Sequence, residues 1–175
     1  MESSRLEAAR TVNRIINNSA YSSIVISNNS SRFEKNGSER SLYALIVRTV
    51  IERKNTLDFV VGMFVKKSPD PTVKSLLYVG IAQILYISRI PDNASCDETV
   101  KAAKTLTDIK RAGFVNGVLR NVCRNRERIF REIEKSDESV RYSMDKSIID
   151  MIRKQYPGDY EEILKSTFER PRMCL

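Results

Sequence analysis

Residues 110–126 read KRAGFVNGVLRNVCRNR, and this stretch decides the fold because its apolar residues recur at helical spacing. Spacings of three and four predict an α-helix with one apolar stripe buried against a core. The stripe comprises Phe114, Val115, Val118, Leu119, Val122 and Cys123. Asn116, Arg120 and Arg124 recur every four residues and fall on the other side. We therefore expect one buried apolar face and one basic, solvated face.

Two glycines interrupt this helix, and each costs roughly 1 kcal/mol relative to alanine. Gly113 is expected to ease the turn into the helix. Gly117 is expected to lie where another backbone approaches closely, either a neighbouring helix or RNA.

The chain is basic, and its excess positive charge is concentrated in one segment. Thirty Lys or Arg face 22 Asp or Glu, a net charge of +8. Residues 101–131 contain nine basic residues against Asp108 and Glu127, a net of +7. This concentration indicates a polyanionic partner, although a modest overall excess is also common in proteins without one.

Composition excludes several classes of function. Without histidine, the chain lacks the commonest general base and metal ligand. Its three cysteines are widely spaced, and no glycine-rich nucleotide loop is present, so we expect no catalytic, cofactor or metal site. Asp97 and Glu98 are interpreted as first-turn carboxylates of a helix. The longest apolar run, residues 76–87, is too short for a bilayer, and a cytoplasmic protein is expected.

Further helices are predicted from spacing and capping residues. The predicted ranges are 4–17, 38–54, 55–65 with Asn55 as N-cap, 71–87, and a helix from Ser95 in a capping box with Glu98. The helix at 73–87 is apolar nearly all round and should be the most buried. Between residues 18 and 38, eleven of 21 residues are Asn or Ser, and the apolar patch at 21–26 is either a short helix or an extended piece. After residues 129–135, which are helical, a polar joint at 136–143 and helices at 147–156 and 159–168 are expected.

Three segments resemble one family. GFVNGVLR at 113–120 resembles the motif of NusB-like RNA-binding domains, where a phenylalanine-valine-asparagine run precedes valine-leucine on a late core helix. DETVKAAK at 97–104 resembles the family's acidic-glutamate-valine-lysine motif. QYPGDYEEILKSTFERPRMCL at 155–175 resembles the junction that leads into the catalytic part of RsmB-type ribosomal RNA cytosine-5 methyltransferases. Arg172 stands where that family usually has its second proline, so this sequence departs from the family pattern at that turn.

The resemblance implies an all-α, NusB-like fold of two small helical bundles packed across each other. Residues 1–140 would be an RNA-binding domain, and 141–175 a helical linker toward a methyltransferase domain missing from this chain. S-adenosylmethionine and the catalytic cysteines would belong to that downstream domain. Arg120 resembles the methyltransferase version, because NusB itself tends to carry an acidic residue there.

The partner implied is RNA, in particular ribosomal RNA, bound by a monomer. The candidate RNA-binding residues are Lys101, Lys104, Lys110, Arg111, Asn116, Arg120, Arg124 and Arg128. Backbone N–H groups at the start of the central helix are expected to add to a phosphate site. Arg10 and Arg14 are an alternative basic surface. Two other functions stay open: a free-standing antitermination factor, and a helical interaction module whose basic face is only solvated.

Overall fold

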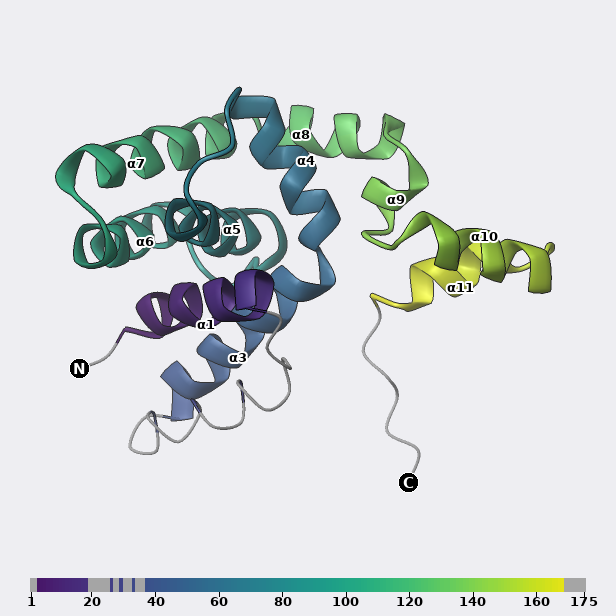
Figure 1. The fold of residues 1–175 in the computed structure, drawn as a ribbon, viewed down its shortest axis with the longest axis horizontal. Helices are drawn as coiled ribbons and strands as arrows, with labels where there is room; N and C mark the ends of the chain where they lie inside the picture. Colours follow the sequence, from purple (N-terminus) through teal and green to yellow (C-terminus); the bar gives the residue numbers. More distant parts are fainter. Residues whose placement is uncertain (1–2, 19–25, 27–28, 30–32, 34–36, 169–175) are drawn as a thin grey trace.

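The computed structural model describes residues 3–18, 26, 29, 33 and 37–168. The regular elements in these residues are all α-helices, which confirms the predicted all-α fold (Figure 1). The helices are α1 (Ser4–Asn18), α3 (Gly37–Glu52), α4 (Lys54–Phe64), α5 (Pro71–Tyr86), α6 (Asp92–Leu106), α7 (Ile109–Arg124), α8 (Arg126–Lys135), α9 (Glu138–Arg141), α10 (Lys146–Gln155) and α11 (Tyr160–Ser166). The short element expected at 21–26 lies outside the described residues, except for Ile26.

Helix α5 is the centre of the larger part of the molecule, which we call the body and which comprises α1 to α8. It packs against α1 and α3 and also against α6 and α7, which run side by side (Figure 1). Asp70 caps α5 by accepting hydrogen bonds from the N–H groups of Thr72 and Val73, each at 3.1 Å, and Pro71 follows in the first turn. Twelve of its sixteen residues are buried, which confirms the prediction that this helix is the most buried.

Helix α7 packs tightly against α5 at Gly80. A Cβ atom built on Gly80 would lie 2.5 Å from Leu119 Cδ2 and 3.2 Å from Leu119 Cγ. Leu119 is fully buried on α7, so its side chain has little room to move. Gly80 therefore lets α7 seat its apolar face on α5.

Two predicted helix starts are wrong. Asn55 is not the cap of α4, because α4 begins at Lys54 almost directly after α3 and has Arg53 as its N-cap. Ser95 is not the cap of α6, because α6 begins a turn earlier at Asp92, after Pro91. The Ser95 hydroxyl is instead buried and has no hydrogen-bond partner among the described residues.

Helices α9 to α11 form a smaller unit, which we call the lobe (Figure 1). Its own apolar cluster centres on Tyr142, Ile149 and Leu164. The polar joint expected at 136–143 is partly wrong, because α9 forms within it. Helix α9 packs on α4, where the Thr56 hydroxyl donates to the Val140 carbonyl at 2.6 Å.

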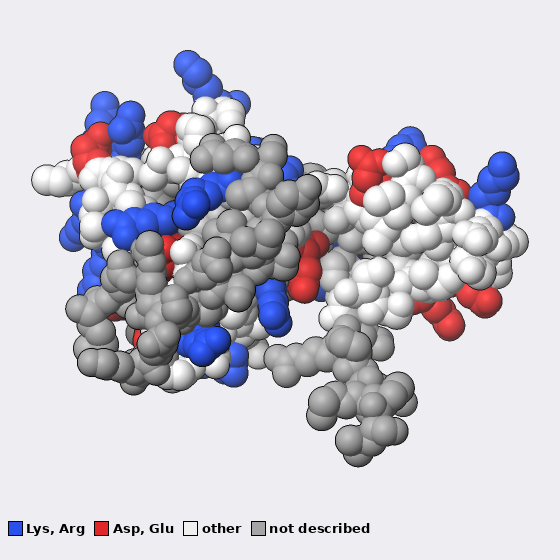
Figure 2. Space-filling model, turned by 60° about the horizontal axis from the view of Figure 1, so that its bottom comes forward, with Lys and Arg blue, Asp and Glu red and all other residues white. Residues whose placement is uncertain are grey.

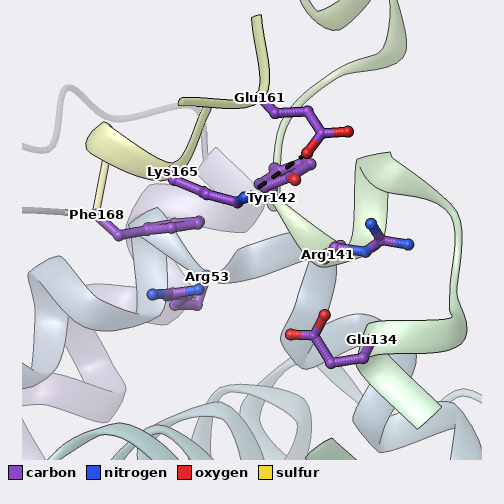
Figure 3. Close-up of a pocket in the computed structure, with 7 residues that line it drawn as sticks. All are labelled: Arg53, Glu134, Arg141, Tyr142, Glu161, Lys165 and Phe168. Atoms are coloured by element: carbon purple, nitrogen blue, oxygen red, sulfur yellow. Dashed lines mark ion pairs between the residues drawn. The ribbon is translucent and has the colours of Figure 1, made fainter. Parts of the chain in front are cut away.

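A stacked arginine also joins the two parts. The guanidinium carbon of Arg53 lies 4.7 Å from the Tyr86 ring centroid and 3.3 Å from the Phe168 ring centroid. Figure 3 shows Arg53 against Phe168 at a cavity of about 280 Å³ that both parts line. Burial lowers the pKa of Arg53 from its ordinary value, an effect that Tyr86 and Glu52 oppose.

The division at residue 140 into an RNA-binding domain and a linker stays a prediction. In the part of the chain that the structure describes, no helix is long and apolar enough to cross a membrane.

Candidate nucleic-acid interface

Helix α7 has the two unlike faces that its sequence predicts. Its buried residues are Ala112, Val115, Val118, Leu119 and Val122. Lys110, Arg120 and Arg124 are exposed on the other side, and we call these three residues with Gly113 and Gly117 the basic face. Helical geometry brings residues three and four apart together, so the three cations border a strip that carries no side chain at the glycines.

The packing role predicted for Gly117 is wrong. A Cβ atom built on Gly117 or on Gly113 would have no atom within 4 Å among the described residues. Both glycines are exposed, so no neighbouring helix explains them. The close helix packing that was predicted at Gly117 occurs instead at Gly80, because Gly80 faces α7 whereas Gly117 faces solvent.

The prediction that Phe114 belongs to the buried apolar stripe is also wrong. Its side chain is 42% exposed, because it lies at the edge of the buried face near the first turn of α7. It lines a cavity of about 660 Å³ together with the segment that joins α4 to α5. Lys66, Lys67 and Lys110 line the same cavity. Aromatic and basic side chains thus share one hollow with the carboxylates of Asp70 and Asp108, which pair with Arg111. Sequence reasoning missed this hollow because Phe114 fits the helical apolar period.

Among the residues that the structure describes, no carboxylate pairs with the cations of the basic face. Arg120 donates from Nε to Asn116 Oδ1 at 3.1 Å, which orients its guanidinium along the helix. Within the described ranges, Lys110, Arg120 and Arg124 form no ion pair, so their charge is not neutralised locally.

The other predicted cations are less uniform. Arg111 forms ion pairs with Asp70 at 3.3 Å and with Asp108 at 3.5 Å, so two carboxylates offset its charge. Lys101 pairs with Glu98 at 2.6 Å, while Lys104 is exposed on the same helix, α6. Arg128 lies on α8, beyond the end of α7.

The phosphate site expected at the start of α7 is not supported. Asp108 caps this helix, and its carboxylate accepts a hydrogen bond from the Arg111 N–H at 2.8 Å. A carboxylate at this position satisfies the N–H group and repels an incoming phosphate.

Charge differs between the two parts of the molecule. Residues 1–135 contain 23 basic and 14 acidic residues, a net of +9, whereas residues 136–175 contain seven and eight, a net of −1. Figure 2 shows one face of the molecule, on which basic side chains are spread over the body with acidic ones among them, and on which the lobe also carries both signs.

Two cysteines meet behind the basic helix, with Cys96 Sγ 3.6 Å from Cys123 Sγ. Burial and the neighbouring thiol raise the pKa of Cys96 to about 12, and burial also raises the pKa of Cys123. Both are therefore protonated thiols that pack between α6 and α7. The described residues contain no group of three or more His, Cys, Asp or Glu arranged to hold a metal ion.

The fold and this surface define an all-α domain that exposes one strongly basic helix. Residues 2–124 match the model of the NusB family, and the chain belongs to this family.

The chain is also similar to larger proteins. It is 31% identical over 129 residues to proteins named ribosomal RNA small subunit methyltransferase B from Escherichia fergusonii and from Escherichia coli O127:H6. The matched region is 72% of this chain but only 29% of each relative. The match thus covers less than a third of the length of these relatives.

Proposed function

We propose that this chain is the RNA-binding part of a ribosomal RNA cytosine-5 methyltransferase, and that α7 is its main RNA contact. The observation that carries the proposal is the basic face, where three cations that pair with no carboxylate of the described residues border two exposed glycines. The names of the relatives support ribosomal RNA as the partner.

The basic face is suited to a nucleic-acid backbone for a physical reason. Lys and Arg that neutralise phosphates release condensed counterions, which supplies much of the binding free energy. The bare strip at Gly113 and Gly117 lets a strand approach the helix more closely than side chains would permit. Beside it, Phe114 offers a surface on which an unpaired base would stack, with Lys66 and Lys67 close to the adjoining phosphates.

The methyl-transfer step is assigned to sequence outside these 175 residues. A cofactor of the S-adenosylmethionine type is usually held at the ends of parallel strands, and the described elements are helices only. The described residues therefore do not fit the cofactor, and we expect no binding of S-adenosylmethionine to this chain. Isothermal calorimetry checks this, and micromolar affinity would contradict it.

The RNA proposal is tested by titrating structured ribosomal RNA fragments at several salt concentrations. Replacing Arg120 and Arg124 together with alanine should weaken binding about tenfold and lower the salt slope by roughly one to two units. The thermal melt should stay nearly unchanged, because both side chains are exposed.

Arg40→Ala with Arg48→Ala is the matched control, since it removes two exposed arginines from α3 and the same charge. An equal loss of affinity in the control would show that the charge acts generally. Arg10→Ala with Arg14→Ala tests the alternative surface on α1. If the wild-type chain itself binds no RNA, the interaction-module hypothesis replaces this one.

A free-standing antitermination factor is the second candidate, because membership of the NusB family does not distinguish the two. The reading frame downstream of codon 175 decides between them. We propose that the chain is cytoplasmic and monomeric in either case. Light scattering after size-exclusion chromatography measures the molar mass and so tests the monomeric state.

A further inference from the structure

The junction between α7 and α8 forms a cavity of about 460 Å³ that is rich in arginine, and we call it the arginine pocket. Its lining residues are Cys123, Arg124, Asn125, Arg126, Glu127, Arg128 and Arg131. Four guanidinium groups against one carboxylate make the pocket strongly positive. Arg131 and Arg126 were not among the sequence-based candidates.

The four arginines do two different things. Arg126 donates to the Ile84 carbonyl at the end of α5 and pairs with Asp92 at 3.4 Å, so it anchors the junction to α5 and α6. Arg124, Arg128 and Arg131 are exposed and form no ion pair within the residues that the structure describes. Arg128 and Arg131 are three apart on α8 and lie on one side of that helix. The guanidinium groups of Arg124, Arg128 and Arg131 thus line the arginine pocket without an ion-pair partner among the described residues. Arg126 holds the α7–α8 junction, and with it the pocket, against α5 and α6.

The start of α8 adds to this arrangement. Asn125 is the N-cap residue, but its side chain makes no capping hydrogen bond and donates instead to the Asn121 carbonyl at 2.8 Å. The first N–H groups of a helix have no partner within the helix, and together with the dipole they favour an anion. The contrast with α7 lies at the N-cap, where α7 has the Asp108 carboxylate and α8 has a neutral asparagine; Glu127, in the first turn of α8, is the one acidic residue that lines the pocket.

We propose that the arginine pocket binds a phosphate group. This inference rests on the proposed function, because it takes the phosphate to belong to the RNA strand that follows the basic face of α7. Arg124 belongs to both surfaces, so the strand would run along α7 and end in the pocket. Guanidinium groups suit this ligand because their planar forks donate two parallel hydrogen bonds to phosphate oxygens.

Arg128→Ala with Arg131→Ala is the test, since these residues lie outside α7 and are exposed. The expected result is about tenfold weaker RNA binding and a salt slope lower by one to two units, with an unchanged thermal melt. Arg40→Ala with Arg48→Ala is again the matched control and should bind like the wild type. Arg126 is left intact, because its loss would disturb the junction itself.

A charge-conserving variant separates recognition from general attraction. Arg128→Lys with Arg131→Lys should restore the salt slope but only part of the affinity, because lysine presents a single point charge. Full affinity in the lysine variant would contradict recognition by guanidinium forks.

Inorganic pyrophosphate distinguishes a free phosphate from one in RNA. Shifts of the Arg128 and Arg131 side-chain NMR signals with pyrophosphate and with RNA support the proposal as stated. Shifts with pyrophosphate alone would place a free phosphate there and overturn the RNA assignment. If the wild type binds RNA and the alanine variant binds equally well, the pocket assignment fails while the proposed function stands. If the wild type binds no RNA, the proposed function fails first.

Discussion

The body and the lobe are both helical, but they differ in how much apolar surface each buries. Among the described residues, the core cluster of the body contains 32 buried apolar residues, whereas that of the lobe contains three. Burial stabilises by roughly 25 cal/mol per Å² of apolar surface, so the body holds most of the stability. The lobe should therefore open locally while the body stays folded.

The charge comparison follows the same division. The net charge of +9 lies in residues 1–135, while residues 136–175 are nearly neutral. Exposed large apolar side chains occur in both parts, among them Ile109 and Phe130 in the body and Met151 in the lobe, so charge and not apolar exposure distinguishes the two surfaces. The two parts thus present different surfaces, and substitutions in each should have separable effects.

The largest effect is expected from Leu164→Ala in the lobe. Leu164 is fully buried in a cluster of only three such residues, so its truncation should cost the lobe about 2–5 kcal/mol. Hydrogen exchange should become fast in α10 and α11 and stay slow in α5. A parallel loss of protection in α5 would mean that body and lobe unfold as one unit.

The second effect tests the core of the body. Gly80→Leu inserts a side chain where Leu119 already lies within contact distance, and overpacking of this kind costs roughly 1–3 kcal/mol. The midpoint of chemical denaturation measures it. Combining Gly80→Leu with Leu119→Ala should recover part of the loss, and a simple sum of the two penalties would argue against their contact.

The third effect concerns the junction. Arg53→Ala removes a guanidinium stacked between Tyr86 and Phe168, an interaction of about 1 kcal/mol. The lobe should then take a wider range of positions, which small-angle scattering would detect as a larger radius of gyration. Helix content should not change, and Arg40→Ala is the control because it removes an exposed arginine from α3.

The smallest effect has the opposite sign. Gly117→Ala should stabilise the body by about 0.5–1 kcal/mol, because alanine is the better helix former and its Cβ atom meets nothing. RNA affinity should fall at the same time if a strand lies against the glycines. Unchanged RNA affinity would show that the glycines do not contact RNA, and the proposed interface would then consist of the three cations alone.

The sequence by itself determined the helices whose signals are local. The continuous apolar character of α5 and the proline in its first turn act within a few residues, and so does the break at Tyr156–Pro157–Gly158, where α10 ends at Gln155. The amphipathic character of α7 and the membership of the NusB family could also be predicted from the sequence. The residue spacing and the family motif both lie in one continuous stretch of the chain.

Only the tertiary structure decided which of these residues meet. Gly80 and Gly117 look alike in sequence, yet the first faces Leu119 and the second faces solvent. Phe114 fits an apolar period but lies at its edge and is exposed, whereas the charge of Arg111 is offset by Asp70, 41 residues earlier. The arginine pocket depends on where α8 turns away from α7 and on the anchor that Arg126 makes to Asp92. Such contacts join residues far apart in the chain, and no local period or capping residue encodes them.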